Sequence, residues 1–549
     1  MAPITRICSA LILALLAGSA TARMPERSAL LAYVQARSAA AEGESETALS
    51  AYAAALEAEP GNDLIAARAF REAVASGDRT LALLAANQLE QLDKLPADAN
   101  LLLIGSHLQA RDVAGAQAIL AKLEAEKQFE QLLPVIRSWV GIAARNPLAP
   151  ESINGAGPNG LGTSMTVEQR AFASLVAGRM IEGLSLIKSS TKGDGRSAVT
   201  RMVGAATFQK MGDPMSARQL IEGPDPSFVL ARHLLDEKRP IGGAIDTPVK
   251  GLAFFYARLA SDMARNRVPF FAMTLGRYAR FLDPDSPLIA LTEAQGLAAN
   301  DEDQEALKAL NTVDPSGPYA SIADESRISL LQRLGLSDEA ARIALATAQA
   351  SSNAADYVQL GDVLNQQGKY RDAAAAYDRA LAASPASSAP DDWGIWLLKG
   401  NVLVQAGDWP AGEAALRKAL SLAPDQPSIL NLLGYALLER RQSIDEAKQL
   451  ITRAAELKPD DAAITDSLGW AYYLSGDFER AVSTLETAAL ADENEPTIRE
   501  HLGDAYWRNG QRVAARYAWK AALLLAEGEA ASRLAEKADF GLTAKTEAR

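Results

Sequence analysis

Small residues return at a fixed interval through the C-terminal third of this 549-residue chain. Glycine opens five successive units, 34 or 35 residues apart except for a five-residue excess in the first interval, at Gly361, Gly400, Gly434, Gly469 and Gly503. Twelve or thirteen residues later comes a second small residue, and seven residues after that an alanine: Ala373/Ala380, Gly412/Ala419, Ala447/Ala454, Ala481/Ala488 and Ala515/Ala522. Units this short cannot bury their own apolar faces, so the repeat predicts a stack of similar units and not one closed core.

The residues around each glycine resemble the tetratricopeptide repeat (TPR). The first unit carries the pattern at Tyr357, Leu360, Gly361, Leu364, Gly368, Ala373, Tyr377, Ala380 and Pro385. The resemblance implies an all-α fold, a right-handed TPR-type superhelix of helical hairpins (an α-solenoid). Small residues at the crossing of two helices allow their backbones to approach closely, and bulky residues fill the space beside them.

The match divides the chain into segments. We expect N-terminal TPR-like helical repeats over 23–145, a Gly/Pro-rich loop over 146–166 and degenerate TPR-like hairpins over 167–350, continuing one superhelix. Five clear units follow over 351–525, with a turn-like insertion at 387–392. Residues 526–549 are expected to form a capping helix and tail, with Leu534 and Ala538 facing inward.

The first 22 residues have the three parts of a secretory signal peptide. Arg6 precedes an apolar run over 7–17, and Ala20 and Ala22 offer small residues for a signal peptidase. A buried N-terminal helix or an uncleaved anchor is the alternative. Ser19 stands where a lipoprotein would carry its lipidated cysteine, so we expect a periplasmic protein that is not a lipoprotein. No later stretch is long and apolar enough to predict a transmembrane helix.

Charge and side-chain chemistry argue against several functions. A net charge of −13 disfavours nucleic acid as a partner. The single cysteine, Cys8, lies in the expected signal peptide, and His107, His233 and His501 are far apart in the sequence. A G-x-G-x-x-G spacing over 155–160 lacks the preceding strand of a dinucleotide site. We therefore expect no enzyme, cofactor or metal site, although an active site assembled in the degenerate middle remains an alternative.

The TPR resemblance implies that the first helix of each unit lines a concave groove. The groove positions lie around the repeated glycine of each unit. They are Asp362, Asn401, Asn431, Tyr435, Asp466, Trp470, Tyr473, Asp504 and Trp507. Aromatic anchors and amide side chains suit a peptide, and the acids favour a neutral or basic one. The lysines of a carboxylate-binding TPR clamp are missing. In the alternative reading, some of these aromatics pack against the next unit.

The chain is similar to bacterial periplasmic TPR adaptors, including lipoprotein partners of carboxyl-terminal processing proteases. This resemblance implies an exported scaffold or adaptor that binds other polypeptides, in envelope protein assembly or quality control. A structural scaffold of a secretion, pilus or polysaccharide-export complex is the alternative. Either role is compatible with peripheral association with an envelope complex.

Overall fold

The helical character of the chain is evident throughout the computed structural model, which describes residues 24–155, 163–190, 195–351, 353–385, 391–543 and 545–547. Within these ranges every regular element is a helix, so the predicted all-α fold is confirmed. The expected signal peptide (1–22), most of the G-x-G-x-x-G segment and most of the 387–392 insertion lie outside the described residues.

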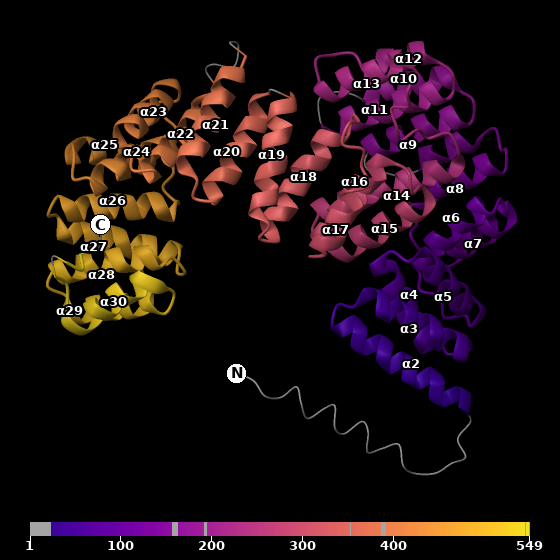
Figure 1. Ribbon diagram of the computed structural model, residues 1–549, viewed down its shortest axis with the longest axis horizontal. Helices are drawn as coiled ribbons and strands as arrows, with labels where there is room; N and C mark the ends of the chain where they lie inside the picture. Colours follow the sequence, from indigo (N-terminus) through magenta and orange to yellow (C-terminus); the bar gives the residue numbers. More distant parts are fainter. Residues whose placement is uncertain are drawn as a thin grey trace. The chain divides into compact units, whose positions relative to one another are not determined.

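The chain divides into two units, with the boundary between Leu336 and Ser337. Figure 1 shows each as a succession of short helices. The helices of unit 1 are α2 Met24–Ala41, α3 Ser45–Ala58, α4 Asp63–Ser76, α5 Arg79–Gln91, α6 Ala99–Gln109, α7 Val113–Ala125, α8 Leu133–Ala143, η2 Ala149–Gly155, α9 Thr163–Val176, α10 Met180–Ser190, α11 Gly195–Lys210, α12 Pro214–Leu220, α13 Pro226–Asp236, α14 Pro248–Arg265, α15 Pro269–Leu282, α16 Pro287–Ala299, α17 Asp303–Leu310 and α18 Ala320–Arg333.

Unit 2 contains the five clear repeats. Its helices are α19 Ser337–Ser351, α20 Ala354–Gln366, α21 Tyr370–Ala383, α22 Trp393–Gln405, α23 Trp409–Leu422, α24 Pro427–Glu439, α25 Ile444–Leu457, α26 Ala462–Leu474, α27 Phe478–Ala491, α28 Pro496–Arg508, α29 Arg512–Leu523 and α30 Gly528–Phe540. Each repeat is a hairpin of an even-numbered first helix and an odd-numbered second helix, from α20–α21 to α28–α29. The predicted TPR-type stack of helical hairpins is confirmed.

Close helix crossings explain why small residues recur in unit 2. A Cβ atom added to Gly361 would lie 2.4 Å from the ring of Tyr377 in the second helix of the same hairpin. Ala373 and Ala380 of that second helix are fully buried. Gly368, at the turn between the two helices, has a φ of 70°, a left-handed conformation that glycine adopts without strain.

Unit 1 differs from the predicted continuous superhelix. Helices α14 and α15 pack against the earlier helices α4, α6, α8 and α9. In most of these pairs, the two helices are more than a hundred residues apart in the sequence. The Tyr256 hydroxyl donates to the Leu101 carbonyl at 2.9 Å, and Arg277 Nη2 donates to the Ala75 carbonyl at 2.8 Å. All residues from 251 to 260 in α14 are buried. A helix segment that is buried on every side needs neighbours on every side, which an open row of hairpins cannot provide.

The helices add detail to the expected segments. The expected 146–166 loop contains the 3-10 helix Ala149–Gly155, and α9 begins at Thr163. The boundary between the two units lies at 336/337, so α19, at the end of the expected 167–350 segment, belongs to unit 2, and the five repeats expected over 351–525 are α20 to α29. The capping helix of 526–549 is present as α30, with Leu534 and Ala538 buried as predicted.

The helix crossings generate a test with an internal control. We expect Gly503→Ala to destabilise unit 2 by about 1–3 kcal/mol, because the added Cβ would lie 2.4 Å from the fully buried ring of Trp519. This cost exceeds the gain in helix propensity of about 1 kcal/mol. Gly394→Ala, where no atom lies within 4 Å of the added Cβ, should be neutral or stabilising. Urea unfolding and hydrogen exchange of α28 and α29 measure both, and equal effects of the two substitutions would contradict the packing argument.

Candidate protein-binding surface

The predicted groove residues lie on the first helices α20, α22, α24, α26 and α28, of which α22 to α28 contact one another in sequence. We call their shared face the first-helix surface. It has two parts with different surroundings. The open part, on α20, α22 and α24, carries half-buried side chains: Val358, Asp362, Leu397, Asn401, Val404, Asn431 and Tyr435. The covered part, on α26 and α28, carries Asp466, Trp470, Tyr473, Glu500, His501, Asp504 and Trp507.

Aromatic stacking fills the covered part. The Trp470 ring stacks on Tyr473, with ring centroids 4.4 Å apart, and on the imidazole of His501 from the next repeat, at 4.2 Å. Trp470 and Tyr473 are 1% and 3% exposed. These two aromatics therefore pack within the stack, as the alternative reading of the sequence had it, and are not open anchors for a ligand.

The carboxylate of Asp466 lies against the same histidine. His501 Nδ1 is 2.9 Å from Asp466 Oδ1, and both side chains are buried. Burial favours the neutral imidazole, but Asp466, with smaller contributions from Asp504 and Glu500, outweighs burial and raises the pKa of His501. The pair therefore joins α26 to α28 as a buried ion pair while the ring is protonated.

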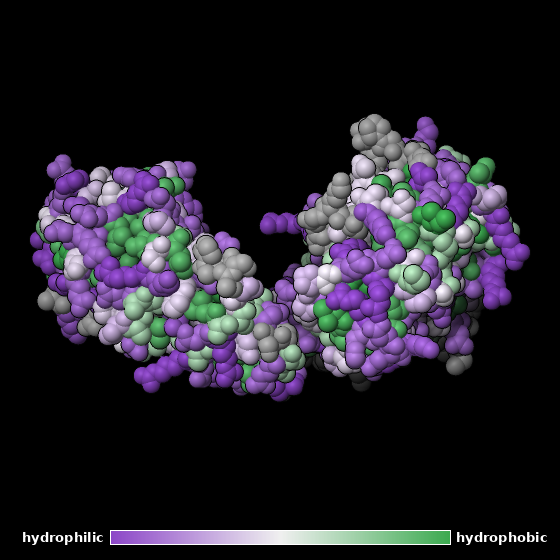
Figure 2. All heavy atoms as spheres, turned by 90° about the horizontal axis from the view of Figure 1, so that it is seen from above, coloured by the Kyte–Doolittle hydropathy of each residue, from purple (hydrophilic) through white to green (hydrophobic). Residues whose placement is uncertain are grey.

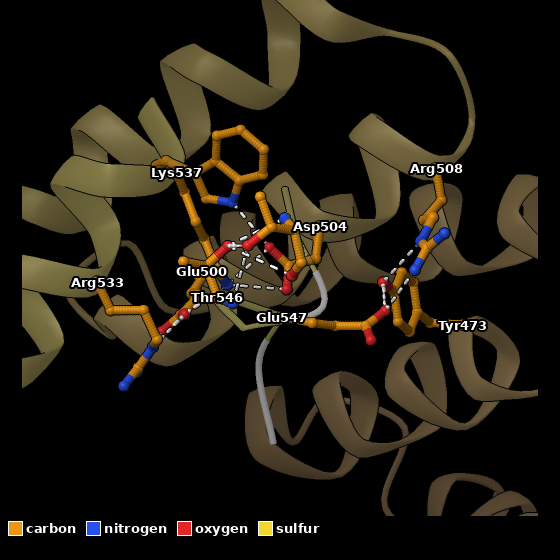
Figure 3. A network of polar contacts seen from close by, with 10 residues as sticks. Tyr473, Glu500, Asp504, Arg508, Arg533, Lys537, Thr546 and Glu547 are labelled. Carbon is orange, nitrogen blue, oxygen red and sulfur yellow. Dashed lines mark hydrogen bonds and ion pairs between the residues drawn. The ribbon is translucent and has the colours of Figure 1, made fainter. Parts of the chain in front are cut away.

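A buried lysine from α30 forms ion pairs with both acids of α28, as Figure 3 shows. Lys537 Nζ lies 2.6 Å from Glu500 Oε1 and 2.9 Å from both oxygens of Asp504, and its side chain is fully buried. Arg533, one helical turn earlier, donates to both oxygens of Glu500 at 2.8 and 2.9 Å. Burial raises the pKa of Glu500, but its bonds to Arg533 and Lys537 outweigh burial and lower it. Trp519 Nε1 donates to Asp504 at 2.9 Å.

The tail after α30 covers the rest of this part. The Tyr473 hydroxyl donates to Glu547, and Arg508 Nη2 donates to the same carboxylate at 3.0 Å. Gly541 lies against Trp507: a Cβ added there would be 2.1 Å from the indole ring. Arg512 also stacks on that indole, 3.9 Å from the ring centroid. Trp507 is consequently half-buried by the chain's own residues.

The covered part corrects the predicted acidic groove. Asp466 and Asp504 face His501 and Lys537 of the same chain, so neither offers an uncompensated charge to a basic ligand. The sequence feature that corresponds to this pairing of acids and cations is the basic pair Arg533 and Lys537, four residues apart on the predicted capping helix. A lysine in an otherwise polar helix is typical of a solvated face, and its partners lie 33 and 37 residues earlier in the chain.

The open part remains accessible and is mostly uncharged. Leu397 and Val404 of α22 lie on either side of Asn401, which occupies the position after the pattern glycine. The amide oxygen of Asn431 is buried, and no described residue donates a hydrogen bond to it. On the face drawn in Figure 2, apolar residues form separate patches within a largely hydrophilic surface. Half-buried apolar side chains beside amide groups can bind an apolar segment and pair with its backbone.

Asp362 is the acid of the open part. The Tyr377 hydroxyl donates to its carboxylate at 2.7 Å. Burial raises the pKa of Asp362, and the bond from Tyr377 only partly opposes that effect. A carboxylate that already accepts a hydrogen bond and is disfavoured in its charged form is a weak attractant for a basic ligand.

Comparison with protein families agrees with this geometry. The model of the tetratricopeptide repeat matches residues 358–427, 397–462 and 467–533. Residues 358–533 of this chain contain tetratricopeptide repeats. The matched segments begin within α20 and end within α30, so they include all five hairpins of the TPR unit.

Individual TPR relatives match over short stretches. The TPR repeat-containing protein PA4667 of Pseudomonas aeruginosa is 34% identical over 115 residues, which are 21% of this chain and 19% of that protein. The protein O-mannosyl-transferase Tmtc1 of Drosophila melanogaster is 30% identical over 103 residues, 19% of this chain and 12% of that protein. The chain thus matches less than a fifth of the length of these curated relatives.

A solved tetratricopeptide repeat protein from Parabacteroides merdae is 15% identical to this chain and has a TM-score of 0.38. The superposition covers 45% of this chain and 96% of that one. None of the helices in the described part combines the length and apolar character needed to cross a membrane. The described residues also contain no group of His, Cys, Asp and Glu side chains arranged to hold a metal ion.

The buried lysine gives a prediction for this protein. We expect Lys537→Met to cost about 3–5 kcal/mol of stability, because it removes the buried cation beside Asp504 and leaves Glu500 with Arg533 alone. The matched control is Lys520→Met on the exposed face of α29, which should change stability by less than about 0.5 kcal/mol. Hydrogen exchange of α28 and α30 and thermal unfolding measure the difference. Adding Glu500→Gln and Asp504→Asn to Lys537→Met should recover part of the loss; no recovery would contradict the charge argument.

The pair of His501 and Asp466 predicts a dependence on pH. Since the pKa of His501 is raised in the folded chain, its stabilising contribution is complete below the unfolded value of about 6.5 and is lost as pH rises through the folded value. The unfolding temperature of the wild type should therefore fall relative to that of His501→Gln between pH 6 and 9. The acids Asp466, Glu500, Asp504 and Glu439 lie near the ring and act on it electrostatically. His233→Gln is the control, because the His233 side chain is 67% exposed. The difference in unfolding temperature between the wild type and this variant should not change with pH in the same way.

Proposed function

We propose that this protein is a scaffold or adaptor that binds other polypeptides along the open part of the first-helix surface. The observation that carries the proposal is the half-buried row on three consecutive repeats, in which apolar side chains alternate with amides. In it the buried Asn431 amide oxygen has no donor among the described residues. A bound segment can supply a backbone N–H to that oxygen, which removes the free-energy cost of an unpaired buried acceptor.

The chemistry of the open part favours a neutral, partly apolar segment. Leu397 and Val404 provide apolar contacts from α22, and Asn401 provides both a donor and an acceptor. The acids of the covered part bind His501, Arg533 and Lys537, so the predicted preference for a basic ligand loses its main support.

The proposed setting is the bacterial envelope. The signal-like segment 1–22 supports export, and Ser19 in place of a lipidated cysteine supports a periplasmic protein without a lipid anchor. An envelope adaptor in protein assembly or quality control is the role we propose, with peripheral association with an envelope complex. The proposal includes no catalytic step: the match to Tmtc1 covers only 12% of that transferase.

Affinity capture tests the binding surface. Tagged full-length protein should retain a polypeptide partner from a periplasmic extract, and Leu397→Asp should weaken that retention about 30-fold or more, as expected when a buried apolar contact is replaced by a charge. Leu490→Asp is the matched control, since Leu490 lies on the second helix α27 and is 77% exposed. Trp470 is unsuitable for this test because it is 1% exposed and supports the stack.

Equal retention by Leu397→Asp, Leu490→Asp and the wild type would exclude the open part as the binding surface. Capture of an outer-membrane channel in place of a soluble polypeptide would favour a structural scaffold of a secretion, pilus or polysaccharide-export complex. Cell fractionation, with and without residues 1–22, tests the periplasmic location.

A further inference from the structure

Unit 1 contains a cavity of about 540 Å³ that the first-helix surface does not include. It lies between α14, α16 and α18, with Val199 of α11 at one side. Its polar lining includes three arginines, Arg258, Arg265 and Arg333, and a single acid, Glu325.

Arg258 is fixed in the cavity wall. Its Nε donates to Glu168 Oε2 at 3.0 Å, and the two side chains are 8% and 1% exposed. The other oxygen of Glu168 accepts a hydrogen bond from the Thr200 hydroxyl, so this carboxylate holds the guanidinium from one side only. Arg258 Nη2 is buried, and no described residue accepts a hydrogen bond from it. The guanidinium is thus oriented, with one N–H group unsatisfied.

The other two arginines add donors at the more exposed edge. Arg265 pairs with Asp262 and Arg333 with Asp303, and neither of these acids lines the cavity. A guanidinium has five N–H donors, so each arginine keeps donors beyond those used by its acid. Planar guanidinium groups bind carboxylates in particular, through paired charge-assisted hydrogen bonds.

Part of the remaining wall is apolar. Leu288 and Leu291 of α16 and Ile322 of α18 line the cavity, and Ile322 is 44% exposed. A ligand that satisfies both kinds of wall carries a carboxylate next to apolar groups.

We propose that this cavity is a second polypeptide-binding site, which takes a carboxylate flanked by apolar side chains and places it against Arg258 Nη2. The carboxylate can come from an acidic side chain or from a chain terminus. The site lies in a different unit from the open part of the first-helix surface, so either site can fail without the other.

Calorimetric titration of the full-length protein with three short peptides tests the site. The first, acetyl-Leu-Ala-Leu-Glu-amide, carries a side-chain carboxylate. The second has glutamine in place of glutamate, and the third is the glutamine peptide with a free terminal carboxylate. We expect at least one carboxylate peptide to bind at least tenfold more tightly than the neutral peptide, and the tighter of the two identifies the source of the carboxylate.

Two Ser→Glu variants on α18 locate the binding. Ser329 lines the cavity and is exposed, so Ser329→Glu places a competing carboxylate there and should reduce affinity at least tenfold. Ser321→Glu, on the same helix and exposed but outside the lining, should bind as the wild type does. Arg258→Lys, which keeps the charge beside Glu168 but removes Nη2, should also weaken binding.

Three results would overturn the proposal: no binding of either carboxylate peptide, equal binding of the neutral peptide, or unchanged binding by Ser329→Glu. The Ser329 variant replaces an exposed residue, so it keeps the test decisive even where Arg258→Lys fails to fold. Leu397→Asp should leave these titrations unchanged, which separates this site from the proposed partner-binding surface of unit 2.

Discussion

The close contact of two helices through a glycine determines most of the structure of unit 2. At Gly361 the backbone of a first helix lies against Tyr377, and at Gly503 it lies against Trp519. Without a side chain at these positions, the large ring of the second helix packs directly on the first-helix backbone. The opposite face of each first helix then points toward its neighbours in the stack, where the first-helix surface forms. The first-helix surface is therefore positioned by this packing, and the packing rings also bond to it, since Tyr377 donates to Asp362 and Trp519 donates to Asp504.

Charge is distributed along that surface in two ways. On α26 and α28, acids and aromatics are paired within the chain, through His501, Lys537 and Glu547. On α20, α22 and α24, the corresponding positions carry mainly apolar and amide side chains that remain half-buried, with Asp362 as the acid. Buried acids without partners would cost several kcal/mol each, so their presence near the end of the stack requires a cation from somewhere in the chain. The capping helix supplies it.

The sequence predicts the repeats well because their cause is local. Small residues at fixed spacing specify helix crossings inside one hairpin, and Ala373 and Ala380 are buried as the pattern requires. Unit 1 was less predictable because its packing joins distant segments: the apolar run of α14 indicates burial on all sides, but nothing in the spacing tells which helices provide it. The groove prediction was wrong about the exposure of Trp470 and Tyr473, since the groups that cover them come from the next repeat and from the tail. Arg258 was missed because a lone arginine reveals neither the acid that holds it nor a missing acceptor.

The two units also differ in how their length can change. Hairpins of unit 2 meet mainly their immediate neighbours, so a whole repeat between α20 and α29 could be duplicated or lost while every remaining junction keeps its chemistry. A repeat added between α29 and α30 would separate Glu500 and Asp504 from the lysine and arginine of α30 with which they pair. In unit 1, α14 and α15 touch helices from several earlier hairpins at once, and removing any one hairpin would open the interior. Evolution can therefore lengthen or shorten this protein's reach through its middle repeats, while the first unit and the final helix stay constant in size.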